Sequence, residues 1–312
     1  MTLPSNVPLG CAVSVAAVIG SGSAATVSNL VTIPISSGGG VCADSMAYVN
    51  PATAAGLSSQ ASVAFGVIQV GQSTGPAATG SGTTTTDSAD AIFYNFSGAS
   101  LTGYESGTQP SLGSCVVTQN VSSVLSLFAP VGLNAGTVTV QGPVGGVQTL
   151  TAVPSAPGAY VAEALPGGFV PTAGGAFTFT ATGASGANSV ASFTQGLSAP
   201  APLLWTNAGK AGTVTRSQGV TVDWTGGDGF VQISGSSIAT SASGTFDASF
   251  TCNAAASAGT FTVPASVLLA LPVGSGSLSV GNYTLPRNFS VSGLDFAVAI
   301  ASAKTVIAAA YN

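Results

Sequence analysis

Residues 176–182 read AFTFTAT, an alternation of apolar and hydroxyl-bearing side chains that is typical of a half-buried β-strand. Toward the N-terminus, residues 137–140 and 147–153 alternate in the same way on either side of the glycine-rich stretch 142–146. Two alternating runs joined by a short Gly/Pro stretch predict a β-hairpin over residues 137–153.

Further alternating runs lie toward the C-terminus, at residues 220–224, 230–233, 246–252 and 277–280. Strand signals that recur about every ten residues, separated by Gly, Pro and Ser, favour β-sandwiches over β-α-β units. Helical patterns are limited to residues 51–60 and 265–271. The sequence therefore predicts an all-β fold of tandem Ig-like β-sandwich modules, with Gly/Ser/Thr-rich loops and little helix.

Changes in composition along the chain predict three units. Residues 1–44 form a partial β-module, which another segment or chain would complete. Residues 45–200 form a β-rich domain that contains the hairpin 137–153 and a polar loop at 73–88, where apolar periodicity is absent. Residues 201–312 follow the linker Pro200-Ala-Pro202 and form a C-terminal Ig-like β-sandwich.

Charged side chains are scarce, and histidine is absent. The 312 residues include 4 Lys+Arg and 9 Asp+Glu, or 4% charged residues, with a formal net charge of −5. In a typical soluble domain, charged residues make up roughly a quarter of the sequence. Without His the chain has no Ser-His-Asp or Cys-His catalysis and no imidazole metal site. Four cations give no electrostatic footprint for nucleic acid.

Motifs that resemble catalytic or metal sites have simpler interpretations. Residues 71–75 match GxSxG, but the nucleophile elbow needs a base that the chain lacks. The pairs Asp87/Asp90 and Asp223/Asp228 supply fewer carboxylates than calcium usually takes, and turn and capping roles explain them. We therefore expect no enzyme activity, no catalytic or metal-binding residue and no cofactor.

Four cysteines, Cys11, Cys42, Cys115 and Cys252, are widely spaced without a CxxC motif, which favours disulfides over zinc. Three pairings are possible, and four buried thiols are the alternative. Cys11–Cys42 is the natural local pair, and Cys115–Cys252 would then join two distant segments.

Other residues have structural or modification roles in this interpretation. Trp224 alternates with two valines and is expected in a sandwich core, whereas Trp205 follows the linker and is expected to pack between modules. Acceptor triplets for N-glycosylation occur at Asn95, Asn120, Asn282 and Asn288.

Several short stretches together resemble a known family. They are Leu9-Gly-Cys11, Val27–Thr32, Gly40–Asp44, Ser111–Cys115, Leu204–Asn207, Val220–Asp228 and Gly259–Pro264. This pattern resembles secreted Ig-like β-sandwich proteins of acidobacteria, which form C-terminal modules of long extracellular proteins. The resemblance implies extracellular Ig-like modules and no catalytic residues. It also implies that residues 1–44 are the later part of a module whose first strands are missing or come from another chain.

A surface so poor in charge has weak repulsion between copies, and its short side chains lose little entropy on contact. We therefore predict an extracellular or cell-surface structural protein that assembles with copies of itself into a filament, sheath or layer, with strand exchange between subunits as the joint. The alternatives are an adhesin or carbohydrate-binding module that binds surface glycans, and the stalk of a larger secreted enzyme. No membrane span is expected, because the most apolar stretch, 294–311, contains Asp295 and Lys304. Stability is expected to change little between about pH 3 and 8.

Overall fold

The computed structural model describes residues 7–20, 26–28, 31–38, 42, 44, 46, 53, 56–77, 81–96, 109–120, 130–162, 164–241 and 244–312. Its strands in the first half are β1 (Gly10–Val15), β2 (Val18–Ile19), β3 (Thr26–Val27), β4 (Val31–Ile35), β5 (Val63–Pro76), β6 (Thr83–Phe96), β7 (Cys115–Asn120), β8 (Val131–Gly132), β9 (Val138–Gln141) and β10 (Val147–Ala152).

The second half contains β11 (Ala159–Val161), β12 (Gly175–Ala181), β13 (Phe193–Ala199), β14 (Leu204–Trp205), β15 (Thr213–Val214), β16 (Val220–Thr225), β17 (Phe230–Ser241), β18 (Gly244–Ala255), β19 (Thr260–Val263), β20 (Gly274–Tyr283), β21 (Arg287–Phe289) and β22 (Phe296–Tyr311). Short helical turns lie at η3 (Ala208–Lys210), η4 (Ala256–Ala258) and α3 (Ala265–Leu268). The all-β prediction is confirmed. No helix of the described ranges is long and apolar enough to cross a membrane.

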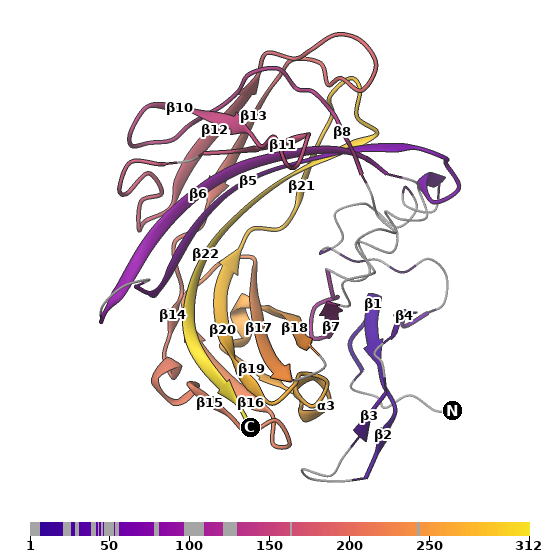
Figure 1. Ribbon diagram of the computed structural model, residues 1–312, viewed down its shortest axis with the longest axis vertical. Coiled ribbons are helices and arrows are strands. Elements are labelled where there is room, and N and C mark those ends of the chain that lie inside the picture. Colours follow the sequence, from indigo (N-terminus) through magenta and orange to yellow (C-terminus); the bar gives the residue numbers. More distant parts are fainter. Residues whose placement is uncertain are drawn as a thin grey trace.

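One sheet of 15 strands dominates the molecule (Figure 1). Its main path runs β13-β12-β9-β10-β11-β6-β5-β22-β20-β17-β18-β7, while β8, β15 and β21 pair beside it. Most pairs are antiparallel, but β22 runs parallel to β5 over ten residue pairs from Phe296↔Phe65 to Thr305↔Thr74. This pairing joins the stretch 45–200 to the stretch 201–312 within one sheet. The three-unit division and the Ig-like character of the units stay predictions.

Long strands explain how one sheet serves two hydrophobic cores. The upper core contains Ile68 and Val70 of β5, Ala299 and Ala301 of β22, and side chains of β9, β12 and β13. The lower core gathers β17, β18, β20, β16 and α3 around the C-terminal end of β22, including Tyr311. Two cores thus form on successive parts of the 16-residue strand β22.

The strand β16 (Val220–Thr225) shows how one alternating strand contributes side chains to the lower core. Its burial alternates, so that Val222 and Trp224 face the core while Thr221 and Thr225 are exposed. The three-stranded sheet β14-β16-β19 packs over the larger sheet in this way. The β-sandwich expectation is therefore met in its coarse form.

Two predictions about loops have different outcomes. The hairpin over 137–153 is confirmed, since β9 and β10 pair from Val147↔Gln141 to Leu150↔Val138. The prediction of a polar loop at 73–88 is wrong, because β5 extends to Pro76, β6 begins at Thr83, and the two strands pair as far as Pro76↔Thr83. Threonine is β-branched and favours strands, and Thr74 and Thr85 share a 2.8 Å hydrogen bond across the pair. Apolar periodicity is missing there because the end of the hairpin is largely exposed on both faces.

Candidate functional site

The sheet that surrounds the upper core has two open ends, at β13 and β21. The hydrogen-bonded order runs from β13 through β12, β9, β10, β11, β6, β5 and β22 to β21. Ala191 N–H donates to Ser292 O over 3.0 Å just before β13 and just after β21. The Phe193 and Phe289 rings then lie 5.7 Å apart between the strands. We call the gap between these two strand edges the seam.

The seam opens away from the Ala191–Ser292 contact. A cleft of about 240 Å³ lies at its open end, where it is lined by Leu197 and Ser198 from β13 and by Leu285 and Arg287 from the other side. Asp228 also lines this cleft. The cleft therefore has one charged residue of each sign, Asp228 and Arg287, and an otherwise largely apolar lining.

The edge of β13 carries no charge and lies close to β22 without pairing with it, and Pro200 follows its last residue. Among the residues that the structure describes, no strand pairs with its outer side. Its sequence, FTQGLSA, contains no charge, and Thr194, Gly196 and Ser198 are exposed. Natural proteins commonly place Lys, Pro or a bulge on such edges because unpaired backbone groups recruit other strands. The chemistry of β13 therefore permits an added strand.

A second feature lies at the other end of the molecule's long axis. The β2–β3 ribbon projects from the lower end, whereas β12 and β13 lie in the upper part (Figure 1). The Val18 and Ile19 side chains are 49% and 76% exposed. An exposed apolar pair on a two-stranded ribbon is a candidate contact surface.

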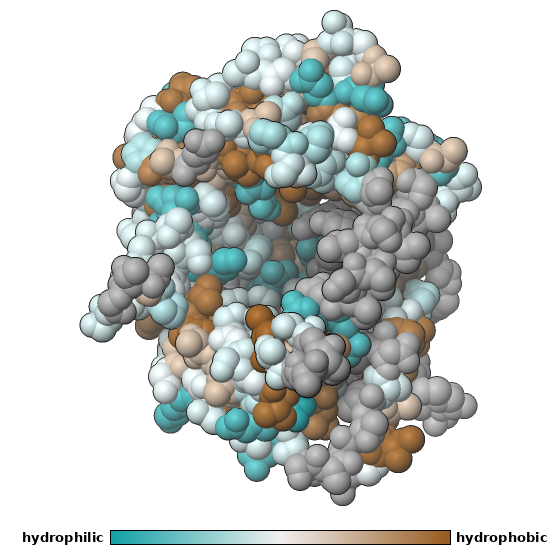
Figure 2. All heavy atoms as spheres, viewed as in Figure 1, coloured by the Kyte–Doolittle hydropathy of each residue, from teal (hydrophilic) through white to brown (hydrophobic). Residues whose placement is uncertain are grey.

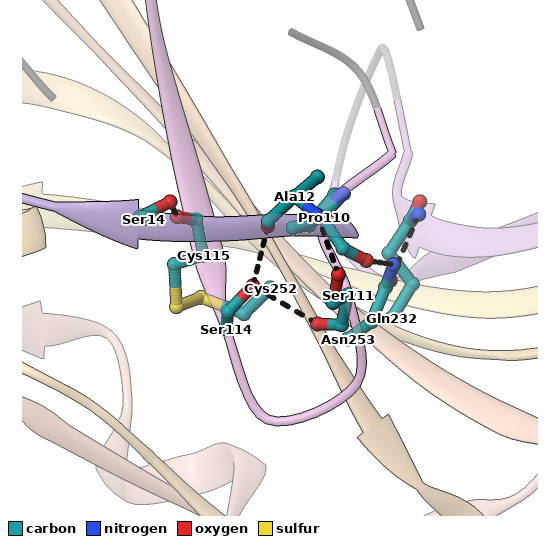
Figure 3. Close-up of a disulfide and its surroundings, with 9 residues drawn as sticks. All are labelled: Ala12, Ser14, Pro110, Ser111, Ser114, Cys115, Gln232, Cys252 and Asn253. Atoms are coloured by element: carbon teal, nitrogen blue, oxygen red, sulfur yellow. Dashed lines mark hydrogen bonds between the residues drawn. A yellow bond between two sulfur atoms is a disulfide. The ribbon is translucent and has the colours of Figure 1, made fainter. Parts of the chain in front are cut away.

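The N-terminal strand β1 packs against the segment Ser111–Cys115 through side-chain hydrogen bonds beside a disulfide (Figure 3). Ala12 N–H donates to Ser111 Oγ at 2.9 Å, and Ser114 Oγ donates to Ala12 O at 3.1 Å. Ser14 Oγ donates to Cys115 O. The segment around Ser111–Cys115 is thus the part of the chain against which β1 packs.

Both expected disulfides form. Cys11 bonds to Cys42, 31 residues away, and Cys115 bonds to Cys252, 137 residues away. Cys115 and Cys252 lie directly opposite each other on the neighbouring strands β7 and β18. Two disulfides indicate an oxidising compartment.

Both tryptophans are buried in the lower core. Trp224 is 3% exposed and its indole N–H donates to Ala256 O at 2.9 Å. Trp205 is 6% exposed and its indole N–H donates to Asn207 Oδ1 at 2.8 Å. Trp205 packs within the same core as Trp224 instead of between separate bodies.

The four asparagines of the acceptor triplets differ in access. Asn288 is exposed and Asn95 is half-buried. Asn282 is 1% exposed, accepts from Asp228 N–H and donates to Ala201 O, so a glycan has no access to it in the folded chain. The side chain of Asn120 lies outside the described part.

The paired aspartates are used as hydrogen-bond acceptors. Asp87 accepts from Gln72 Nε2 at 3.0 Å and from Val170 N–H at 3.1 Å. Asp223 accepts from Asn207 Nδ2 at 2.8 Å and from Thr260 Oγ1 at 2.7 Å. Within the described ranges no three His, Cys, Asp or Glu residues group as metal ligands.

The face of the large sheet opposite the two cores is apolar at its upper end, where Phe65, Val67 and Phe96 form a third, smaller cluster. Below this cluster the face is mainly polar. The register places small hydroxyl and amide side chains side by side on β6, β5, β22, β20, β17 and β18. Serine pairs bridge neighbouring strands, with Ser234 and Ser279 at 2.7 Å and Ser236 and Ser277 at 3.1 Å. We call this surface the polar face. Figure 2 shows a hollow with hydrophilic residues in the middle of the molecule.

Burial raises the pKa of three groups on this face, Asp90, Tyr94 and Tyr283. The pKa of Asp90, on β6, is raised to about 6, mainly because burial desolvates its carboxylate. Gln69 Nε2 donates to its Oδ1 at 2.8 Å and partly offsets that effect.

Comparison of the chain with protein-family models, with curated proteins and with solved structures finds no match. The function of the chain is therefore inferred from its geometry. Neither the seam nor the polar face has a local sequence signal, because each is assembled from strands far apart in the chain.

Proposed function

We propose that the chain is an extracellular structural protein whose copies assemble into a filament, sheath or layer. The observation that supports this most strongly is the seam, which offers two strand edges without a charged residue on β13. A second copy is the occupant that we propose for it.

The β2–β3 ribbon of a neighbouring copy has the chemistry that the seam would accept. The seam's cleft is lined by apolar Leu197 and Leu285, and the ribbon presents Val18 and Ile19. Full burial of an exposed Val or Ile contributes about 1.5–3 kcal/mol, so Ile19, which is 76% exposed, would gain most of this and Val18, which is 49% exposed, about half. Main-chain hydrogen bonds to the free edge of β13 would orient the incoming strand.

The positions of seam and ribbon favour an open assembly. A contact between two different surfaces is head-to-tail, and such contacts extend into filaments unless the rotation closes a ring. The ribbon and the upper lobe lie toward opposite ends of the long axis (Figure 1). Repetition of this contact would therefore lengthen the assembly with each added copy.

Composition lowers the barrier to this contact. The formal net charge is −5 over 312 residues, so copies repel one another weakly. Two disulfides support an oxidising environment such as the cell exterior. Both properties suit a weakly charged protein that works as a building unit outside the cell.

A pair of lysine substitutions tests the seam. Thr194→Lys places a charge on the free edge of β13, whereas Thr180→Lys places the same charge on the exposed face of β12, which is paired on both sides. We expect Thr194→Lys to reduce the assembled fraction in sedimentation at least about tenfold. Thr180→Lys should assemble as the unmodified chain does. Equal assembly by the two variants would refute the seam as the joint.

The ribbon has its own matched pair. Ile19→Lys should abolish assembly, while Val147→Lys, at a side chain that is 61% exposed on β10, should not. Assembly that survives Ile19→Lys would show that another surface supplies the joint.

A further inference from the structure

A small pocket of about 150 Å³ lies on the polar face, between β6, β5, β22 and β20. Gln69, Ser73, Ser88, Tyr283 and Lys304 contribute to its lining. Pockets for drug-sized ligands are typically at least about 300 Å³. This one is therefore of a size for a single small ring or a short acid.

Two glycines create the space. A Cβ at Gly71 would lie 3.0 Å from Ser88 Oγ and 3.3 Å from Ser302 Oγ, so these two hydroxyls converge over the bare backbone of Gly71. A Cβ at Gly281 would lie 2.7 Å from Lys304 Cβ and so would crowd the lysine. The pocket floor thus depends on the missing side chain at Gly71, while Gly281 leaves room for Lys304 and Tyr283 beside the pocket.

Lys304 is the cation of this pocket. It is half-buried, and no acidic group of the described residues forms an ion pair with its ammonium. An ammonium that is partly removed from water is stabilised by an anionic partner. The other lining side chains provide hydroxyls and an amide, which suit the hydroxyl groups of a sugar.

The charge balance favours a monoanion. One ammonium matches one carboxylate, and Asp90 lies beyond Gln69 on the same face. A phosphate or sulfate would bring extra negative charge toward that carboxyl group. The pocket is therefore better matched to a hydroxylated carboxylate than to a polyanion.

We propose that this pocket binds one uronic acid unit, with the carboxylate on Lys304 and the ring hydroxyls on Ser88 and Ser302. The proposal is independent of the seam, because no residue of the pocket lines the cleft between β13 and β21. It would let the protein attach to acidic polysaccharide through the polar face.

Binding of D-glucuronate is measured by isothermal titration calorimetry or by shifts in amide NMR signals. The expected Kd is about 1 mM, as for a ligand held by one charge contact and a few hydrogen bonds. Neutral D-glucose and inorganic phosphate should each bind at least about tenfold more weakly. Equal binding of glucose, or tighter binding of phosphate, would overturn the proposal.

Two variants locate the site. Lys304→Met should weaken glucuronate binding at least about tenfold, whereas Lys210→Met, which removes an exposed lysine on η3, should leave it unchanged. Gly71→Ala fills the floor and should weaken binding without removing a charge. Thermal unfolding of each variant shows whether the fold is kept. Undiminished binding by a folded Lys304→Met or Gly71→Ala variant would overturn the assignment.

Discussion

Asp90 gives the chain a dependence of stability on pH that its composition alone does not predict. Burial raises the pKa of Asp90 from the usual 3.8 to about 6. At pH values between 3.8 and about 6, the Asp90 carboxyl of the folded chain holds a proton that the unfolded chain has already lost. The free energy of unfolding therefore falls as pH rises from about 4 to 6. This revises the expectation of constant stability between about pH 3 and 8.

The size of the effect follows from the shift. A change of one pKa unit corresponds to 1.36 kcal/mol, so the shift at Asp90 costs the folded protein up to about 3 kcal/mol at pH 7, and about 2 kcal/mol of stability is lost between pH 4 and pH 7. Asp90→Asn removes the charge and keeps a carbonyl oxygen to accept from Gln69 Nε2, the bond that is 2.8 Å long in the structure. We expect this variant to be more stable than the unmodified chain at pH 7 by up to about 3 kcal/mol and nearly equal to it at pH 4.

Urea unfolding between pH 4 and 7, followed by tryptophan fluorescence, measures both curves. Both tryptophans lie in the lower core, so their emission reports the loss of that core. Asp228→Asn serves as the control because its side chain is exposed. A flat curve for the unmodified chain, or an equal slope in Asp90→Asn, would refute the reasoning.

Three further changes test the packing. Replacing Cys115 and Cys252 by Ala opens a disulfide that spans 137 residues and should lower the free energy of unfolding by about 5 kcal/mol in urea; a loss under about 1 kcal/mol would show that this disulfide does little to stabilise the fold. Trp224→Phe leaves Ala256 O without its donor and should cost about 2–3 kcal/mol, and an unchanged midpoint would argue against that bond. Tyr311→Phe removes a buried hydroxyl that donates to a carbonyl of β20 at 2.8 Å and should lower stability by about 1 kcal/mol, which thermal unfolding can check against Tyr94→Phe.

Local patterns in the sequence predicted the parts of the fold that depend on neighbouring residues. The alternation at 220–224 placed Val222 and Trp224 on the buried side of a strand, as the structure has them. The turn at 142–146 defined a hairpin because both strands are adjacent in the chain. The threonine-rich end of β5 and β6 was missed, since exposed strands have no apolar face to reveal their period.

Contacts between distant segments were not predictable in this way. The parallel pairing of β22 with β5 joins residues more than two hundred positions apart, and no local pattern specifies it. The seam depends on β13 and β21 meeting across the upper core, and the pocket depends on Gly71 lying beside Ser302. Composition did predict the general chemistry of both surfaces, because a chain with 4% charged residues leaves its edges and faces with few charges.

Sedimentation velocity of the unmodified chain tests assembly most directly, over a hundredfold range of concentration in 0.15 M and in 1 M NaCl. A contact made by apolar side chains and main-chain hydrogen bonds should persist at high salt, since screening weakens only charge interactions (the Debye length falls to about 3 Å at 1 M). We predict species that grow with concentration and are equally large in both salts. A single species with the mass of one chain at every concentration would contradict the account.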